Sequence, residues 1–131
     1  MVHIIDNLPN DVLGFQLTKI ITGEDYENII IPAVEAAFSE RKNLRLLYFL
    51  DQEFEKFEGA ALWDDTKVGL KHYTHWEKIA IVTDSKLLKE SLMIAGFFTP
   101  GEFQFFSISE LAEAKEWLKS ELEEQHLRPR L

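Results

Sequence analysis

The sequence contains no cysteine, which removes disulfides, thiolate nucleophiles and cysteine-bound metal or iron–sulfur sites together. Long hydrophobic runs are also missing: residues 46–50 and 92–98 are far shorter than the roughly 18 residues of a membrane-spanning helix. The N-terminus lacks a basic region followed by an apolar stretch, so no secretory signal is expected and a cytoplasmic location is predicted.

Positive charge is scarce. Lys and Arg number 14 against 23 Asp and Glu, giving a formal net charge of −9. This balance disfavours nucleic acid as a partner, because the phosphate backbone carries the same sign of charge. What the chain does have is core material, with 46% hydrophobic residues among 131. That length and composition predict one domain spanning residues 1–131.

Five strands are predicted, two in an opening hairpin and three in later apolar segments. Segments 2–6 and 12–20 flank a turn-forming cluster at 8–11, and Gly14 marks a bulge or bend. Residues 44–50 and 79–82 are almost continuously apolar, which is typical of parallel strands covered on both faces. The last predicted strand covers residues 103–106.

Helices are predicted between these strands. Thr22 is a candidate N-cap, Pro32 predicts a kink or restart, and residues 83–85 offer oxygens to cap a later helix. Ser107 and Glu110 have the spacing of a capping box before a final helix. One apolar stripe follows the period of a helix, at Tyr26, Ile29, Ile30, Ala33 and Ala37. The predicted fold is α/β in the order β-β-α-β-α-β-α-β-α, a mainly parallel mixed sheet of about five strands with about four helices.

Several local strings carry a family resemblance over essentially the whole chain. They are Thr22-Gly-Glu-Asp-Tyr26, Ile31-Pro-Ala33, Gly59-Ala-Ala-Leu-Trp-Asp64, Gly69-Leu-Lys-His72 and Phe98-Thr-Pro-Gly-Glu102. With the element order, they resemble the SpoIIAA-like branch of the STAS domain superfamily. The resemblance implies a compact domain related to bacterial anti-sigma-factor antagonists, which bind partner proteins and are switched by phosphorylation.

In those relatives the phosphorylated residue lies in an Asp-Ser-(Ser/Thr)-Gly string between a central strand and the next helix. The corresponding connection here is Asp51–Gly59, which has the Asp and the Gly and no hydroxyl between them. A phosphate would also meet the like charges of Glu53, Glu55 and Glu58. The resemblance therefore predicts no phosphorylation site, and any antagonist-like role would be independent of phosphorylation. Ser85 follows a later strand and is interpreted as a helix cap.

An apolar segment is the leading candidate for a binding surface. Residues 92–98 would be hydrophobic around most of a helix end, where a surface helix has a polar face. The segment either packs within its own chain or forms a homodimer face, a partner-docking face or the wall of a pocket for an apolar ligand. The predicted ligand or partner surface comprises Leu62, Trp63, Met93, Phe97 and Phe98.

The STAS fold also resembles the lipid-binding CRAL-TRIO fold, which adds a lipid-like ligand or a peripheral membrane contact to these alternatives. The hypothesis is a non-enzymatic binding or regulatory domain without a cofactor, because no nucleophile-elbow or phosphate-cradling motif is present. The alternative from another class is a metal-assisted hydrolase. Its ligands would be Asp64, His72 and His75, since His-x-x-His places two imidazoles on one helix face.

Overall fold

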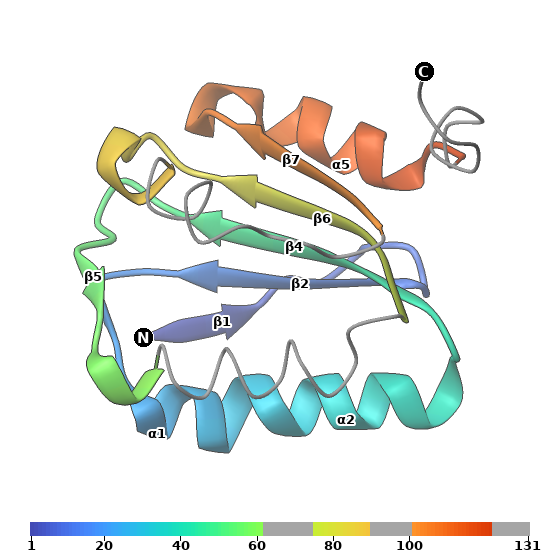
Figure 1. The fold of residues 1–131 in the computed structure, drawn as a ribbon, viewed down its shortest axis with the longest axis horizontal. Coiled ribbons are helices and arrows are strands. Elements are labelled where there is room, and N and C mark those ends of the chain that lie inside the picture. The colour runs from blue at the N-terminus through green and yellow to red at the C-terminus, as the bar shows by residue number, and fades with distance from the viewer. Residues whose placement is uncertain (62–74, 90–100, 122–131) are drawn as a thin grey trace.

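A mixed five-stranded sheet forms the centre of the computed structural model, which describes residues 1–61, 75–89 and 101–121 (Figure 1). The strands lie in the order β1-β2-β4-β6-β7, with β1 antiparallel to β2 and every other neighbouring pair parallel. Their bounds are Val2–Ile4, Val12–Leu17, Leu44–Leu50, Trp76–Val82 and Glu102–Phe106. The predicted α/β class and mainly parallel mixed sheet are confirmed.

The opening hairpin is present, with shorter strands than predicted. Its turn is closed by the Val12 N–H, which donates to the Pro9 carbonyl at 2.9 Å. Strand β2 ends at Leu17 and does not reach Ile20, because Lys19 has a φ of 57° and so leaves the extended conformation.

Of the bulge or bend predicted at Gly14, the bulge was wrong: β2 runs in regular register with β4 through this residue, which pairs with Leu47. The glycine is required by close packing, since a Cβ there would lie 2.5 Å from Leu8 Cδ1 and 3.3 Å from Ile5 Cβ. The register shift in this part of the sheet falls between Leu44 and Arg45, where β4 meets β6.

A second, two-stranded sheet was not predicted. It pairs β3 (Ile20–Ile21) with β5 (Lys56–Phe57) in parallel, just beyond the carboxyl ends of β2 and β4. Two-residue strands are too short to show an alternating pattern, so sequence periodicity could not reveal them.

The first helical segment begins at the predicted cap and contains the predicted interruption. It runs from α1 (Gly23–Asp25) through a π-helical turn (Tyr26–Ile30) into α2 (Ile31–Glu40). The Ile31 N–H donates to the Tyr26 carbonyl, five residues back, and Pro32 occupies the first turn of α2. A proline has no N–H to donate, so the helix restarts around it.

Thr22 and Asp25 form a reciprocal capping box at the start of α1. The Thr22 N–H donates to Asp25 Oδ2 at 2.9 Å, and the Asp25 N–H donates to Thr22 Oγ1 at 3.1 Å. Partial burial by itself would raise the pKa of the Asp25 carboxyl, but the Thr22 N–H and the nearby Met1 ammonium group outweigh it and hold this pKa below its ordinary value.

Replacing Asp25 by alanine is expected to lower the free energy of unfolding by roughly 1 kcal/mol near neutral pH, because the Thr22 N–H and the Met1 ammonium group lose their acceptor. A carboxyl whose pKa is lower in the folded state stabilises above its unfolded pKa of about 3.9 and loses that effect as the pH falls through the folded value. The deficit of Asp25→Ala should therefore shrink on acidification to about pH 3, as measured by urea unfolding. Glu24→Ala is the control, and an equal loss in both variants would contradict the assignment.

Helices cover both faces of the sheet, and each face has its own core (Figure 1). On the α2 side the buried residues include Phe15, Leu17, Tyr26, Ile30 and Val34. On the other side, α5 (Leu111–Lys119) packs Ala114 and Leu118 against Leu47, Ala80 and Val82. The central strands are therefore buried on both faces, as their continuous apolar sequences predicted.

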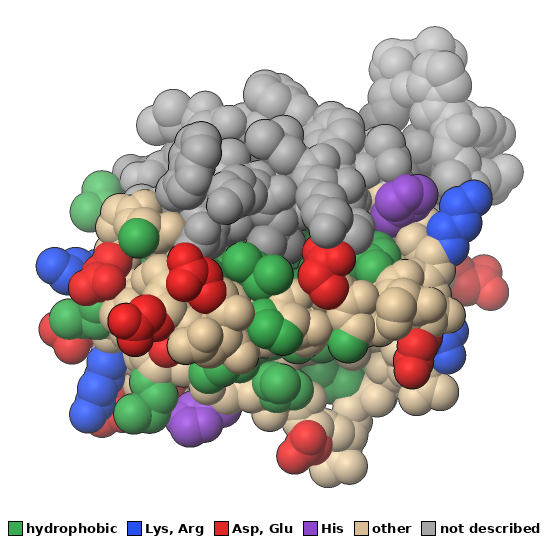
Figure 2. Space-filling model, turned by 90° about the horizontal axis from the view of Figure 1, so that it is seen from below, with side chains coloured by type: hydrophobic (Ala, Val, Ile, Leu, Met, Phe, Trp, Pro, Cys, Tyr) green, Lys and Arg blue, Asp and Glu red, His purple; other side chains and the backbone are tan. Residues whose placement is uncertain are grey.

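The α2 face of the molecule carries acidic side chains. Figure 2 shows acidic side chains lying among hydrophobic ones, with Lys and Arg at the two ends of this view. This arrangement disfavours contact between α2 and an anionic membrane surface. Within the ranges that the structure describes, no helix has the length and apolar character needed to cross a bilayer.

Candidate active surface at the carboxyl ends of two strands

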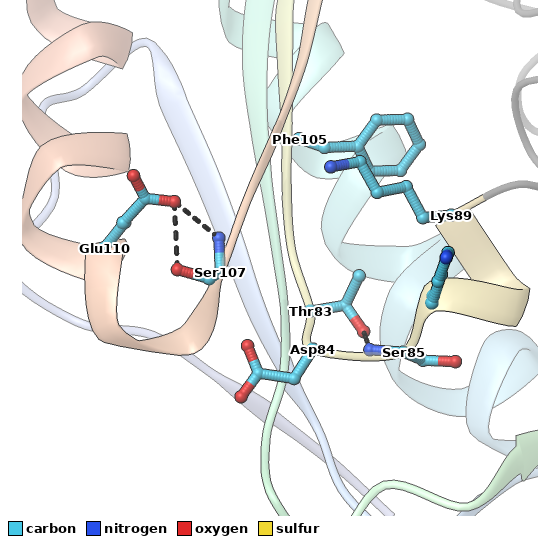
Figure 3. Close-up of a pocket in the computed structure, with 8 residues that line it drawn as sticks. Thr83, Asp84, Ser85, Lys89, Phe105, Ser107 and Glu110 are labelled. Atoms are coloured by element: carbon cyan, nitrogen blue, oxygen red, sulfur yellow. Dashed lines mark hydrogen bonds between the residues drawn. The ribbon is translucent and has the colours of Figure 1, made fainter.

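An open pocket of about 580 Å³ lies at the carboxyl ends of β6 and β7 (Figure 3). Open α/β sheets bind ligands preferentially at the carboxyl ends of their parallel strands. We call this site the β6–β7 pocket. Its lining residues come from the two loops that leave these strands and from the helix that begins at Lys86: Thr83, Asp84, Ser85, Lys86, Lys89, Phe105, Ser107 and Glu110.

One wall is the loop that joins β6 to the next helix. The Leu88 N–H donates to Ser85 Oγ at 3.2 Å, and the Ser85 N–H donates to Thr83 Oγ1 at 3.1 Å. These bonds confirm the cap predicted at residues 83–85 and identify Ser85 as the residue that provides it.

The opposite wall is the loop between β7 and the short 3₁₀ turn Ile108–Glu110 that precedes α5. The Ser107 N–H and hydroxyl both donate to Glu110 Oε1, at 2.8 and 2.9 Å. The Ser107 N–H, followed by the Ser107 hydroxyl, holds the pKa of the Glu110 carboxyl below its ordinary value, and the charge of Lys89 acts in the same direction. The predicted pairing of Ser107 with Glu110 is thus confirmed.

Asp84 joins the two walls. Its Oδ1 accepts a hydrogen bond of 2.8 Å from the Ile108 N–H, and the Thr83 N–H donates to the Phe106 carbonyl at 2.9 Å. The two loops are therefore held to each other by bonds that involve their own backbones. The result is a pocket shape that exists before any ligand arrives.

Two lysines and one aromatic ring complete the site. Lys86 and Lys89 are exposed, and Lys89 Nζ lies 5.6 Å from the centroid of the Phe105 ring. The lining contains no histidine, and its serine and carboxylate groups are hydrogen-bonded to caps and loops. The site can offer charge, hydrogen bonds and an aromatic surface, and the hydroxyl–carboxylate contact in its lining, Ser107 with Glu110, belongs to the turn that precedes α5.

Residues of the connection Asp51–Gly59 also make hydrogen bonds and packing contacts that hold this loop in place. Asp51 Oδ2 accepts from Gln16 Nε2 at 2.9 Å, and Asp51 Oδ1 accepts from the Glu53 N–H at the same distance. Phe54 and Phe57 pack partly buried against the α2-side core. The Asp that the family resemblance singled out therefore shapes the loop.

The predicted binding surface falls outside the part of the chain that the structure describes. This applies to Leu62, Trp63, Met93, Phe97 and Phe98, and also to the metal candidates Asp64 and His72. His75 is described: its Nδ1 lies 3.4 Å from Asn43 Oδ1 and its ring lies 6.4 Å from that of Phe38. Residues 1–61, 75–89 and 101–121 contain no group of three side chains suited to hold a metal ion. The apolar surface and the metal site stay predictions.

The β6–β7 pocket itself was missed by sequence reasoning. A usable signal was present, because two capping sequences, at 83–85 and at 107–110, each follow a strand of the predicted sheet. Only the neighbouring positions of β6 and β7 make them face each other.

Comparison with known proteins supports the fold and the resemblance. A family model described as SpoIIAA-like matches residues 12–119. The chain is also similar to the crystal structure of an uncharacterised protein of the DUF3478 family with a SpoIIAA-like fold, from Shewanella loihica PV-4. That similarity has a TM-score of 0.73 and 32% identity over 89% of this chain and 93% of the other. No curated protein matches. Because the family match covers most of the chain and the structural relative agrees with it, the chain belongs to the SpoIIAA-like family.

Proposed function

We propose that this chain is a non-enzymatic binding domain that docks a partner protein at the β6–β7 pocket. The observation that carries the proposal is the pocket itself, in which two loops tied by Asp84 present lysine, hydroxyl and aromatic groups at one end of the sheet. A SpoIIAA-like fold is often used for regulation or binding, which agrees with this role.

Binding is favoured over catalysis because the reactive types of side chain in the pocket already have structural partners. Ser85 caps a helix, Glu110 holds the loop at Ser107, and Asp84 holds the Ile108 N–H. A general base must be within hydrogen-bond reach of the proton it removes, and withdrawing these groups from their caps would loosen the pocket walls.

A protein is favoured over a small ligand because the pocket is open. Small-molecule sites usually enclose about 70–90% of a drug-sized ligand, which an open surface hollow cannot do. The neighbouring Leu87 is 76% exposed and offers an apolar contact beside the polar lining. In the sequence it precedes Met93, Phe97 and Phe98, which belong to the predicted apolar surface.

A photo-reactive phenylalanine analogue placed at Leu87 is expected to form a covalent adduct with one partner protein in the cells from which the chain comes. The matched control is Ile4, which is 50% exposed on β1, at the opposite edge of the sheet from β7. Mass spectrometry of the adducts is the measurement. Adding Lys86→Glu should abolish the adduct at position 87, because it reverses a charge in the pocket lining.

No adduct at position 87, or the same adducts at positions 87 and 4, would contradict a docking site at this pocket. Native mass spectrometry of the protein purified from its own host separates the remaining alternatives. A retained lipid-sized mass would replace the protein partner by an apolar ligand, and a stable homodimer would identify a second copy as the partner.

A further inference from the structure

Helix α5 is attached to the sheet by one apolar face. Of its nine residues, Ala114 and Leu118 are buried, and Leu111 and Trp117 are partly buried. Its N-terminal end follows the turn fixed by Ser107 and Glu110. Apolar packing therefore holds one side of this helix, and polar contacts at its two ends add to the attachment.

Two basic side chains hold the C-terminal end of α5. Arg45 on β4 and Lys78 on β6 are direct neighbours in the parallel register of the two strands. Arg45 Nη1 donates to the Leu118 carbonyl at 2.7 Å and also to the carbonyl of Ser120. Lys78 Nζ donates to the Trp117 carbonyl at 2.8 Å and to Ser120 Oγ at 2.6 Å. It also reaches the carbonyls of Ser120 and Glu121, at 3.0 and 3.4 Å.

These contacts give hydrogen-bond partners both to the last carbonyls of α5 and to the ammonium group of Lys78. The last carbonyls of a helix have no partner within the helix and form the negative end of its dipole. The Lys78 side chain is fully buried in the middle of a strand, where an ammonium group is costly unless acceptors surround it. The Trp117 ring adds a further favourable contact, with its centroid 4.7 Å from Lys78 Nζ.

We infer that Lys78 and Arg45 form a clasp that keeps α5 closed over the sheet, and that α5 is a strap whose C-terminal end opens when the clasp is weakened. Among the described residues, Trp117, Ser120 and Glu121 supply acceptors to Lys78, so the end of α5 cannot leave without withdrawing them from the ammonium group. Opening uncovers the apolar side chains of Leu47, Ala80 and Val82 beneath the helix.

Hydrogen–deuterium exchange tests the clasp in the full chain. In Lys78→Met, the amides of α5 should exchange at least about tenfold faster than in the unaltered protein, because hydrogen bonds from a charged group are lost. The amides of β4 and β6 should change much less. The control is Lys119→Met, which removes one charge from the same helix at a side chain that is 50% exposed. It should leave exchange in α5 within about twofold.

Unchanged exchange in α5, or a rise of the same factor in α5 and the central strands, overturns the clasp. Should Lys78→Met fail to fold, Ser120→Ala decides the question by the same criterion, since it removes the hydroxyl that accepts from Lys78 and donates to the Trp117 carbonyl. A rise confined to α5 in Ser120→Ala supports the clasp, and its absence overturns it.

Discussion

Replacing Gly101 by alanine is expected to lower the free energy of unfolding by about 3 kcal/mol, because the added methyl group overpacks the backbone at the start of two parallel strands. A Cβ at this position would clash with the Trp76 carbonyl oxygen and lie 2.7 Å from that of Glu77. Both atoms belong to the backbone of β6, which is held between β4 and β7 and cannot move aside cheaply. Equilibrium unfolding in urea measures the effect.

Gly59 provides the matched control. A Cβ there would have no atom within 4 Å, and the residue lies in the first turn of a helix. Gly59→Ala should therefore be neutral or stabilise by up to about 1 kcal/mol, through the helix propensity of alanine and a lower entropy of the unfolded chain. Similar losses in the two variants would mean that packing against β6 is not the reason for a glycine at position 101.

Replacing Phe15 by alanine is expected to cost about 4 kcal/mol, because it removes a large side chain from a packed core. Phe15 is fully buried on β2, and its ring meets that of Tyr48 edge-on, with 6.0 Å between the centroids. Both the transfer of the ring from water and its aromatic contact are then lost. A shift of the urea midpoint with an unchanged slope would report this loss as a change in stability alone.

Phe54 carries the same side chain in a different setting, on the loop after β4 and only partly buried. Phe54→Ala should cost less than half as much as Phe15→Ala, because less apolar surface returns to water. Equal losses would indicate that the loop residues 51–58 contribute to the core as strongly as β2 does.

The function proposed here depends on a site that sequence reasoning did not select. The sequence pointed to apolar residues in two connections, Leu62 and Trp63 in one and Met93, Phe97 and Phe98 in the other. The described structure instead presents a polar pocket beside the first turn of the second of these connections. Leu87 lies between two lining residues of the pocket, Lys86 and Lys89, and precedes the predicted apolar residues in the sequence. The crosslinking experiment at Leu87 therefore bears on both hypotheses.

Local signals were sufficient for much of the fold. Strand β4 has the bounds predicted from its apolar run, Leu44–Leu50. The caps at Thr22, Ser85 and Ser107 lie where the side-chain types predicted them. These features depend on residues within one or two turns of each other, so their physical cause is visible in the sequence itself.

Other features depend on contacts between distant segments. Strand β6 begins at Trp76, three residues before the predicted start, because Glu77 and Lys78 resemble the end of a polar loop when seen alone. Lys78 can occupy a buried strand position only because carbonyls near residue 120 surround its ammonium group. The same reason applies to the glycine at position 14 and to the β3–β5 pair, which require neighbours that no local pattern specifies.

The sequence by itself therefore determined the α/β class, the family and the starts of the helices, because hydrophobic period, capping chemistry and family strings are properties of short segments. Tertiary structure decided which loops face each other to form the β6–β7 pocket, and where Arg45 of β4 and the buried Lys78 of β6 find their acceptors. Both depend on the order of strands in the sheet, which brings residues from different parts of the chain within hydrogen-bond distance.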